Sequence, residues 1–294
     1  MSAGVEQQAL DRAEAARRHS RWIIYILVWV IVCVPLVLFK SLPMLASDPT
    51  VKMYEAIDAL TAEQGLVIVA IDWDAGTMAE NGPQTEGVVE HLFRKNLKFA
   101  IFGWAYPAGP EIAENQIVTE LAQKYHKVYG TDYVNWGYKT GGYQMLTGLA
   151  RDIPHVIGEK DSHGATLTDF PIMQGIHDYS NISMVVDFTG SNTLQYWVQF
   201  WQGQFGVKLS YGCTGVIVPE AFPYLDAGQI KGVLKGLAGA AEYKFLLKAD
   251  DPKSQNAYVK MTAQSLMHVF IILLVILGNI IYFRTRAPRG TAGA

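Results

Sequence analysis

The sequence predicts an α/β fold: a three-layer domain with a mostly parallel sheet, flanked by one N-terminal and one C-terminal transmembrane helix. Three observations support this prediction. Half of the 294 residues are hydrophobic and only 17% are charged, whereas an ordinary soluble domain has about 25% charged residues. Two long uncharged apolar runs lie near the ends of the chain. Between them, apolar runs of strand length alternate with segments of helical periodicity, which is typical of a parallel sheet covered by helices.

The two terminal apolar runs have the length of membrane-spanning helices. They cover residues 22–39 and 261–283, and about 20 apolar residues are needed to cross a hydrocarbon core. The first run follows basic residues, as in a secretory signal. It is longer than the apolar part of a cleaved signal peptide, however, and no small-x-small cleavage pattern follows, so we interpret it as an uncleaved signal anchor. Two buried core helices are the alternative.

Basic residues predict how these spans are oriented. Four arginines precede the first span, and three follow the second without an acidic residue. Positively charged flanks remain in the cytoplasm. We therefore expect a two-pass protein of the cell membrane, with cytoplasmic tails at residues 1–21 and 284–294 and an extracytoplasmic domain at residues 40–260.

Strands and helices are expected to alternate along this domain. Continuous apolar runs predict strands buried on both faces, and apolar residues three or four apart predict amphipathic helices. Residues 137–176 show the least periodicity and are expected to form long loops. In chain order we expect a helix at 48–63, a strand at 66–71, a helix at 77–96, a strand at 98–103, a helix at 111–126, the start of a strand at 128–129, a strand at 182–187, a helix at 192–204, and strand pieces at 207–211 and 215–218.

Polar residues follow several of the expected strands. The carboxyl ends of parallel strands share one edge of the sheet, and ligands of open α/β folds bind there. The alternative for the turn after the first strand is helix capping, because such turns need caps whether or not a ligand binds. The predicted ligand-binding residues are Asp72, Asp74, Thr77, Trp104, Tyr106, Asp187, Thr189 and Tyr211.

Two residue pairs are candidates for catalysis. Asp72 and Asp74 could flank a cation or a reacting group. The segment 72–77 resembles the opening motif of haloacid-dehalogenase-type phosphatases, which implies a hydrolase, although one additional residue precedes its Gly-Thr. His163 and Cys213 have a spacing similar to that of the dyad in caspase-like cysteine peptidases, which implies a thiol nucleophile. A buried, inert thiol is the alternative for the cysteine.

Other kinds of chemistry are not indicated. The histidines lack the short pairings of zinc sites, and the phosphate-loop, dinucleotide and nucleophile-elbow motifs are missing, so we expect no metal and no cofactor. The net charge of −3 argues against a nucleic-acid partner. The two cysteines are too few for a disulfide framework.

A stripe of small residues marks the last part of the domain. An expected helix at residues 226–243 carries glycine or alanine at every fourth position. Because an interior glycine costs up to about 1 kcal/mol relative to alanine, this stripe indicates a face that another backbone approaches closely. Packing against its own sheet is the alternative. Together with aromatic residues of the preceding helix, the predicted interface residues are Gly228, Gly232, Gly236, Ala240, Trp197 and Trp201.

These features lead to three hypotheses about function. The first is a non-enzymatic subunit or scaffold of a membrane assembly, in contact with the lipid bilayer and with copies of itself or partner membrane proteins. The second is a membrane-tethered small-molecule-binding domain of the solute-binding or sensor type. The third is a hydrolase that uses Asp72 and Asp74, or His163 and Cys213.

Overall fold

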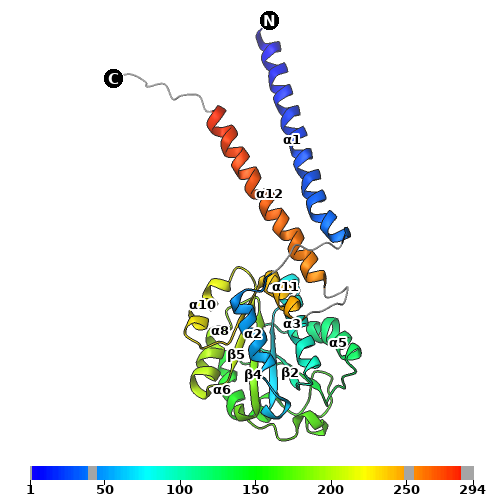
Figure 1. The fold of residues 1–294 in the computed structure, drawn as a ribbon, viewed down its shortest axis with the longest axis vertical. Helices are drawn as coiled ribbons and strands as arrows, with labels where there is room; N and C mark the ends of the chain where they lie inside the picture. The colour runs from blue at the N-terminus through cyan, green and yellow to red at the C-terminus, as the bar shows by residue number, and fades with distance from the viewer. Residues whose placement is uncertain (1, 39–44, 248–254, 286–294) are drawn as a thin grey trace, which may run out of the picture. The chain divides into compact units, whose positions relative to one another are not determined.

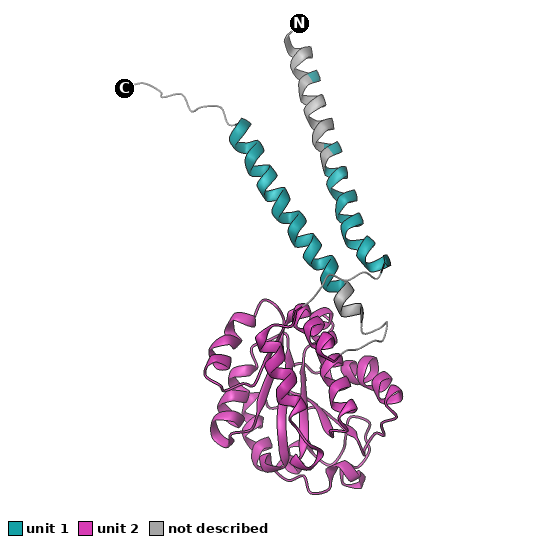
Figure 2. Ribbon diagram, in the orientation of Figure 1, with its two compact units in different colours: residues 1–42, 258–294 teal, residues 43–257 magenta. Residues whose placement is uncertain are grey.

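The computed structural model describes residues 2–38, 45–247 and 255–285 (Figure 1). These residues form two compact units, which Figure 2 distinguishes by colour. One unit contains the two terminal helices, and the other is the α/β domain. The predicted domain boundary at residues 39–40 and most of the predicted C-terminal tail, residues 286–294, lie outside the described residues.

The two terminal helices extend beyond the predicted apolar runs. They are α1 (Ser2–Leu38) and α12 (Gln255–Thr285). Their apolar windows, Arg21–Leu38 and Lys260–Thr285, have mean hydropathies of 2.4 and 2.5, so both helices are long and apolar enough to cross a membrane. The windows are 6% and 0% buried within the chain, unlike helices at the core of a soluble protein.

The α/β domain contains a parallel sheet of six strands among the described residues, in the order β3-β2-β1-β4-β5-β6. The chain begins in the centre of the sheet, runs outward to β3, and returns to place β4 beside β1. The strand order therefore reverses between β1 and β4, as in doubly wound folds, and the predicted α/β class is confirmed. The strands are β1 (Leu66–Asp72), β2 (Phe99–Gly103), β3 (Tyr133–Tyr138), β4 (Ile182–Thr189), β5 (Leu209–Cys213) and β6 (Val233–Lys235).

Helices cover both faces of the sheet and complete the three layers. Every residue of β1 is buried because side chains alternate between two covered faces. The first face is covered by α2 (Asp48–Asp58), α3 (Met78–Arg94), the continuous segment α4 (Gly109–Ala113), η2 (Glu114–Val118) and α5 (Thr119–Lys124), and α11 (Gly236–Leu246). The second face is covered by α6 (Tyr143–Arg151), α7 (Ile153–Ile157), the continuous segment α8 (Leu194–Trp197), η6 (Val198–Gln202) and α9 (Gly203–Phe205), and α10 (Val218–Asp226).

The remaining elements are short. η2 and η6 are π-helical segments inside longer helices. Single 3₁₀ turns occur at η1 (Ala62–Gln64), η3 (Leu167–Asp169), η4 (Pro171–Met173) and η5 (Tyr179–Asn181).

The structure differs from the expectation in three places. Residues 128–129 do not start a continuous strand: Tyr129 forms only an isolated bridge with Tyr133, hydrogen bonds between Val128 and Asp132 close the turn that follows, and the third strand begins at Tyr133. Residues 215–218 lead into α10 rather than forming a strand. The region expected to form long loops, residues 137–176, contains α6 and α7, but after α7 it is a long loop with single 3₁₀ turns, so this expectation is confirmed in part. In each case glycines or prolines obscured the periodicity on which the prediction depended.

The expected helix at residues 226–243 is also wrong. Gly228 turns the chain after α10 with φ +71°, and Gly236 begins α11 with φ +52°, so β6 lies between the two helices. Gly232 instead allows a close approach within the domain, because a Cβ there would lie 2.3 Å from the backbone nitrogen of Met53. The four small residues therefore share no helical face.

Candidate functional site

The candidate site lies where the strand order reverses, at the carboxyl ends of β1 and β4. In doubly wound folds the chain leaves neighbouring strands toward opposite faces here, which creates a binding crevice. Asp72 ends β1 and is paired with Thr189, while Asp187 is paired with Ala70 two residues earlier. The alternation of side chains places both carboxyl groups on the same face of the sheet as Trp104.

The carboxyl group of Asp72 is fully buried, and only one of its two oxygens has hydrogen-bond partners. Its Oδ1 accepts hydrogen bonds from the backbone N–H groups of Trp104 (2.9 Å) and Ala105 (2.8 Å), in the loop after β2. Its Oδ2 is buried without a hydrogen-bond partner. Burial raises the pKa of Asp72 to about 7, although these backbone N–H groups favour the ionised form. A carboxyl group of this kind changes its charge near neutral pH.

Asp187 repeats this arrangement one strand away. Its Oδ2 accepts a hydrogen bond of 2.5 Å from the hydroxyl group of Thr193, and its Oδ1 is buried without a partner. Burial and the neighbouring charge of Asp72 raise the pKa of Asp187 well above its ordinary value. Among the described residues, no Lys, Arg or His forms an ion pair with either carboxyl group.

Other unpartnered polar atoms lie at the same edge of the sheet. The described residues contain eight buried side-chain atoms without a hydrogen-bond partner, and all except Ser210 Oγ belong to residues at or following the carboxyl ends of β1, β2, β4 and β5. Buried polar groups are normally paired, so such a concentration indicates a missing ligand or ordered water. The seven atoms are Asp72 Oδ2, Thr77 Oγ1, Asn81 Oδ1, Trp104 Nε1, Asp187 Oδ1, Trp197 Nε1 and Thr214 Oγ1.

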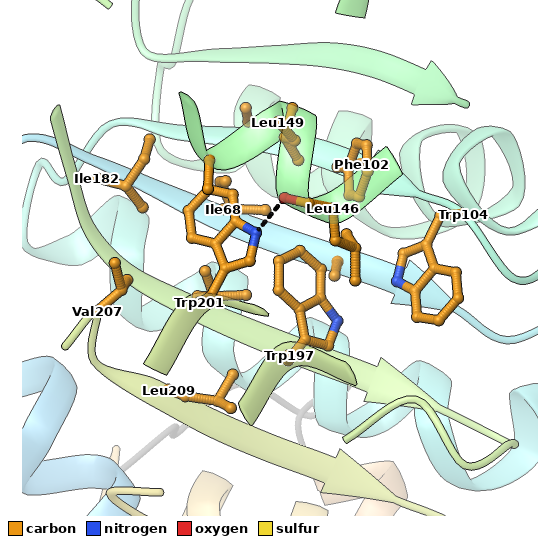
Figure 3. Packing of buried hydrophobic residues seen from close by; sticks show 14 of the residues in the cluster. Ile68, Phe102, Trp104, Leu146, Leu149, Ile182, Trp197, Trp201, Val207 and Leu209 are labelled. Atoms are coloured by element: carbon orange, nitrogen blue, oxygen red, sulfur yellow. Dashed lines mark hydrogen bonds between the residues drawn. The ribbon is translucent and has the colours of Figure 1, made fainter. Parts of the chain in front are cut away.

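The two unpartnered indoles lie on the same side of the sheet. Figure 3 shows Trp104 and Trp197 with their nitrogen-bearing edges turned toward each other. The indole of Trp201, in the same cluster, instead donates a hydrogen bond of 3.0 Å to the carbonyl of Leu146. Two unused N–H donors therefore lie on the face of the sheet that also carries the two unused carboxyl oxygens.

The loops after β1 and β4 approach each other closely at this edge. The backbone N–H of Gly190 donates to the carbonyl of Asp72 at 3.2 Å. A Cβ at Gly190 would lie 2.7 Å from Thr77 Oγ1, so glycine is required for this approach. The loop after β4 is further held by Ser191, whose backbone N–H donates to Thr189 and whose carbonyl accepts from Tyr211.

The structure thus brings most of the predicted ligand-binding residues together. Tyr106 takes part through its backbone N–H, which favours ionisation of Asp72. Asp74 is separate: its Oδ1 accepts from the backbone N–H of Gly76 at 2.8 Å, which closes a turn before α3 and does not cap the helix. Thr77 makes no side-chain capping hydrogen bond, so capping does not account for it.

Four polar contributors were not predicted from the sequence. Asn81 donates to the carbonyl of Thr189 at 3.1 Å, and Gln84 donates to the carbonyls of Cys213 (2.9 Å) and Gly236 (2.8 Å). Thr193 holds Asp187, and Thr214 adds an unpartnered hydroxyl group. A sequence signal existed for the first two, because they occupy the helical face of α3 that also carries its buried apolar residues.

The structure does not bring His163 and Cys213 together. His163 Nε2 lies 3.1 Å from Glu114 Oε2, and its backbone neighbour Ser162 bonds to Asn135 in β3. Cys213 ends β5, four strand positions away, or roughly 19 Å at the usual strand spacing. Burial raises the pKa of the Cys213 thiol to about 12, and Asp187 contributes further, which opposes formation of a nucleophilic thiolate.

The predicted interface residues are mostly inside the domain. Trp197 and Trp201 are 0% and 1% exposed, and the small residues other than Gly228 are buried. They are therefore core residues of this domain. Within the described residues, no group of three His, Cys, Asp or Glu residues is arranged to hold a metal ion.

No protein-family model matches the chain, and no curated protein is significantly similar to it. The resemblances to haloacid-dehalogenase-type phosphatases and caspase-like peptidases therefore have no support from a family match. The function must be argued from the site itself.

Proposed function

We propose that this protein is a membrane-tethered binding protein whose α/β domain holds a small organic ligand at the carboxyl ends of β1 and β4. The observation that carries this proposal is the cluster of buried, unpartnered polar atoms around Asp72 and Asp187. An unpaired buried polar group costs about 1–3 kcal/mol, and more if it is charged. A protein that keeps several such groups in one place retains them for a partner that is bound there.

The position of the cluster supports the same conclusion. It coincides with the reversal of strand order, where ligands of doubly wound proteins bind. The hypothesis of a membrane scaffold has lost its main argument, because most of the small residues and tryptophans assigned to an interface are buried in the domain.

The ligand site is tested with the full-length chain in mild detergent. A collection of small metabolites is screened for compounds that raise the temperature of thermal unfolding. We expect at least one compound to stabilise the wild type, and the effect to be lost in Asp72→Asn and Asp187→Asn. Asp169→Asn is the matched control, because Asp169 is an exposed carboxylate outside the site. Stabilisation that is equal in all four proteins, or no stabilisation by any compound, would contradict the proposal.

Membrane attachment is supported by the apolar windows of α1 and α12, whose side chains are almost entirely unburied within the chain. We propose that both helices span the cell membrane, with the termini in the cytoplasm and the domain outside.

In a Cys33→Ser background, Lys231→Cys introduces a thiol at an exposed position of the domain. A membrane-impermeant maleimide should label it in intact cells. Labelling only after the membrane is permeabilised would reverse the proposed orientation.

A further inference from the structure

The candidate site contains two acidic side chains and no base with which to balance them. We infer that the ligand carries an organic ammonium group, which donates hydrogen bonds to Asp72 Oδ2 and Asp187 Oδ1, and an oxygen acceptor that faces the indole N–H groups of Trp104 and Trp197. This inference rests on the proposed function and specifies the class of molecule that is bound. It assigns each unpartnered carboxyl oxygen a donor and each unpartnered indole an acceptor.

The electrostatic surroundings of the two acids favour a cation. The titratable groups that act on them or beside them are Tyr211 and Cys213 on β5, and their own pKa values are raised by burial and by Asp187. Further out, Glu80 on α3 and Glu220 on α10 add negative charge near Cys213. None of these groups carries a positive charge, so none of them opposes the binding of a cation.

The basic residue that follows β3 does not add positive charge at the two acids. Lys139 begins the loop after β3, and its backbone N–H donates to the carbonyl of Gly103. Burial lowers the pKa of Lys139, and the charge that opposes this effect is that of Asp161, not that of Asp72. A bound ammonium group would therefore supply the only positive charge acting on the two acids among the groups that the structure describes.

Aromatic rings extend from the site to the surface. Trp104 meets Tyr196 edge to face, with ring centroids 5.7 Å apart at 89°. Tyr196 stacks on Tyr143 at 4.7 Å, and Tyr143 stacks on Phe200 at 6.0 Å. Trp104 is 7% exposed and Tyr143 is 42% exposed, so the rings form a graded route to solvent.

The route ends at a loop with an unusual backbone. Gly141 and Gly142 precede Tyr143 with φ values of +116° and +60°, a conformation that other residues rarely adopt. Both glycines are exposed, and no side chain or backbone atom lies within 4 Å of a Cβ placed on Gly142. Tyr143 is thus attached to a segment with room to move at the outer end of the aromatic route.

A neutral polyol could also donate hydrogen bonds to carboxyl groups, so charge must be tested separately from shape. The probes 4-aminobutan-1-ol and butane-1,4-diol have the same number of heavy atoms and differ in one ammonium group. The full-length protein is labelled with 5-fluorotryptophan and studied by fluorine NMR in detergent, where Trp104→Phe identifies the signal of Trp104. We expect the amino alcohol to shift this signal saturably, and the diol to bind at least tenfold more weakly.

The pH dependence provides a test that needs no variant. Since the pKa of Asp72 is about 7, its ionised form, which an ammonium group prefers, becomes populated between pH 6 and 8. The affinity for 4-aminobutan-1-ol should therefore rise over this interval, while the affinity for butane-1,4-diol should not. An affinity for the amino alcohol that is constant with pH would overturn the inference.

Variants distinguish a failure of this inference from a failure of the proposed function. Asp72→Asn and Asp187→Asn should each weaken binding of the amino alcohol at least tenfold, and Asp169→Asn should not. Equal binding of the two probes, or no movement of the Trp104 signal with either, overturns the ammonium assignment. The proposed function then still stands if the metabolite screen yields a neutral compound that depends on Asp72, and it fails with the inference if the screen yields none.

Discussion

Buried carboxylates in two regions of this domain have opposite surroundings: one has basic partners and the others have none among the described residues. Glu90 on α3 is 1% exposed, yet its Oε1 accepts hydrogen bonds from Tyr125 (2.5 Å) and Arg94 (2.9 Å), and its Oε2 lies 3.7 Å from Lys244 Nζ. Burial alone would raise the pKa of Glu90, but these partners and Lys124 hold it below its usual value. Asp72 and Asp187 are buried as deeply and have no basic partner among the described residues.

The difference separates a carboxylate with a structural role from two carboxyl groups for which we propose a binding role. Around Glu90, the charges of α3, α5 and α11 neutralise one another, and the group holds three helices together. At the carboxyl ends of β1 and β4, one oxygen of each carboxyl group accepts hydrogen bonds, and no basic residue among those described offsets the rest of the cost of burial. Buried charge is retained without a partner mainly where function needs it. The four predictions that follow test this contrast, beginning with the largest effect.

Removal of Glu90 should have the largest effect on stability. Glu90→Ala leaves Lys244, which is 1% exposed, without one of its two carboxylate neighbours. Breaking a buried pair from one side costs about 3–5 kcal/mol. Denaturant unfolding of the full-length protein, followed by tryptophan fluorescence, should show this loss. Glu111→Ala is the control, because Glu111 is exposed on α4. A loss no larger than that of the control would show that the Glu90 network does not stabilise the domain.

Asp72→Asn should stabilise the folded protein above neutral pH, whereas Glu90→Ala should destabilise it. Because burial raises the pKa of Asp72 from 3.8 to about 7, the folded protein binds more protons than the unfolded chain between these values. Stability therefore falls as the pH rises from about 4 to 7. Asparagine can still accept the hydrogen bonds of Trp104 and Ala105, but it carries no charge.

The variant should consequently resemble the wild type near pH 4 and be more stable at pH 8, by on the order of 3–4 kcal/mol. The measurement is a series of denaturant midpoints across this pH range. Asp187 keeps a pH dependence of its own, since burial also raises its pKa. If wild type and variant show parallel pH profiles, Asp72 is not the group that titrates.

A smaller change in stability is expected from replacing tryptophan by phenylalanine, and the same substitution at two tryptophans can be compared directly. Trp201 Nε1 donates to the carbonyl of Leu146, so Trp201→Phe removes a hydrogen bond and should cost about 0.5–1.5 kcal/mol, in addition to the loss of ring contacts. Trp104 Nε1 has no partner, so Trp104→Phe loses only the ring contacts. In thermal unfolding, the midpoint temperature should be lower for Trp201→Phe than for Trp104→Phe. The reverse order would mean that Trp104 donates a hydrogen bond in the folded protein.

The smallest effect is expected at Cys213. The thiol is 0% exposed, and burial raises its pKa to about 12. In a Cys33→Ser background, a maleimide reagent at pH 7.5 should leave the native protein unlabelled and should label the unfolded protein. Rapid labelling of the native protein would restore Cys213 as a candidate nucleophile.

Much of the fold could be predicted because local patterns and tertiary packing agree. β1, β2 and β4 are continuous apolar runs, and α3 has apolar residues at helical spacing, so burial and periodicity indicate the same element. The prediction failed at residues 226–243, where small residues every fourth position suggested one helix. The spacing was a coincidence of two turns and a close contact: Gly228 and Gly236 have positive φ values, and Gly232 approaches Met53.

Part of the candidate site could be predicted from the order of strands and polar residues along the chain. The rule that polar residues after parallel strands share one edge of the sheet correctly brought Asp72, Trp104 and Asp187 together. It could not separate Asp72 from Asp74, because two neighbouring aspartates in a turn differ only in the direction of their side chains. Asn81 was missed because helical periodicity can place it on the buried face of α3 but cannot show which strand end its side chain reaches.

The sequence by itself determined the α/β class, the two long apolar terminal helices and the set of polar residues at the strand ends. These follow from periodicity and chain length, which are local properties. Only the tertiary structure decided the order of the strands, the place where that order reverses, and which buried polar atoms remain without a partner. These depend on contacts between segments far apart in the chain, such as that of β1 with β4. The assignment of a binding site rests on this second kind of information, because an unpaired group can be recognised only when everything around it is known.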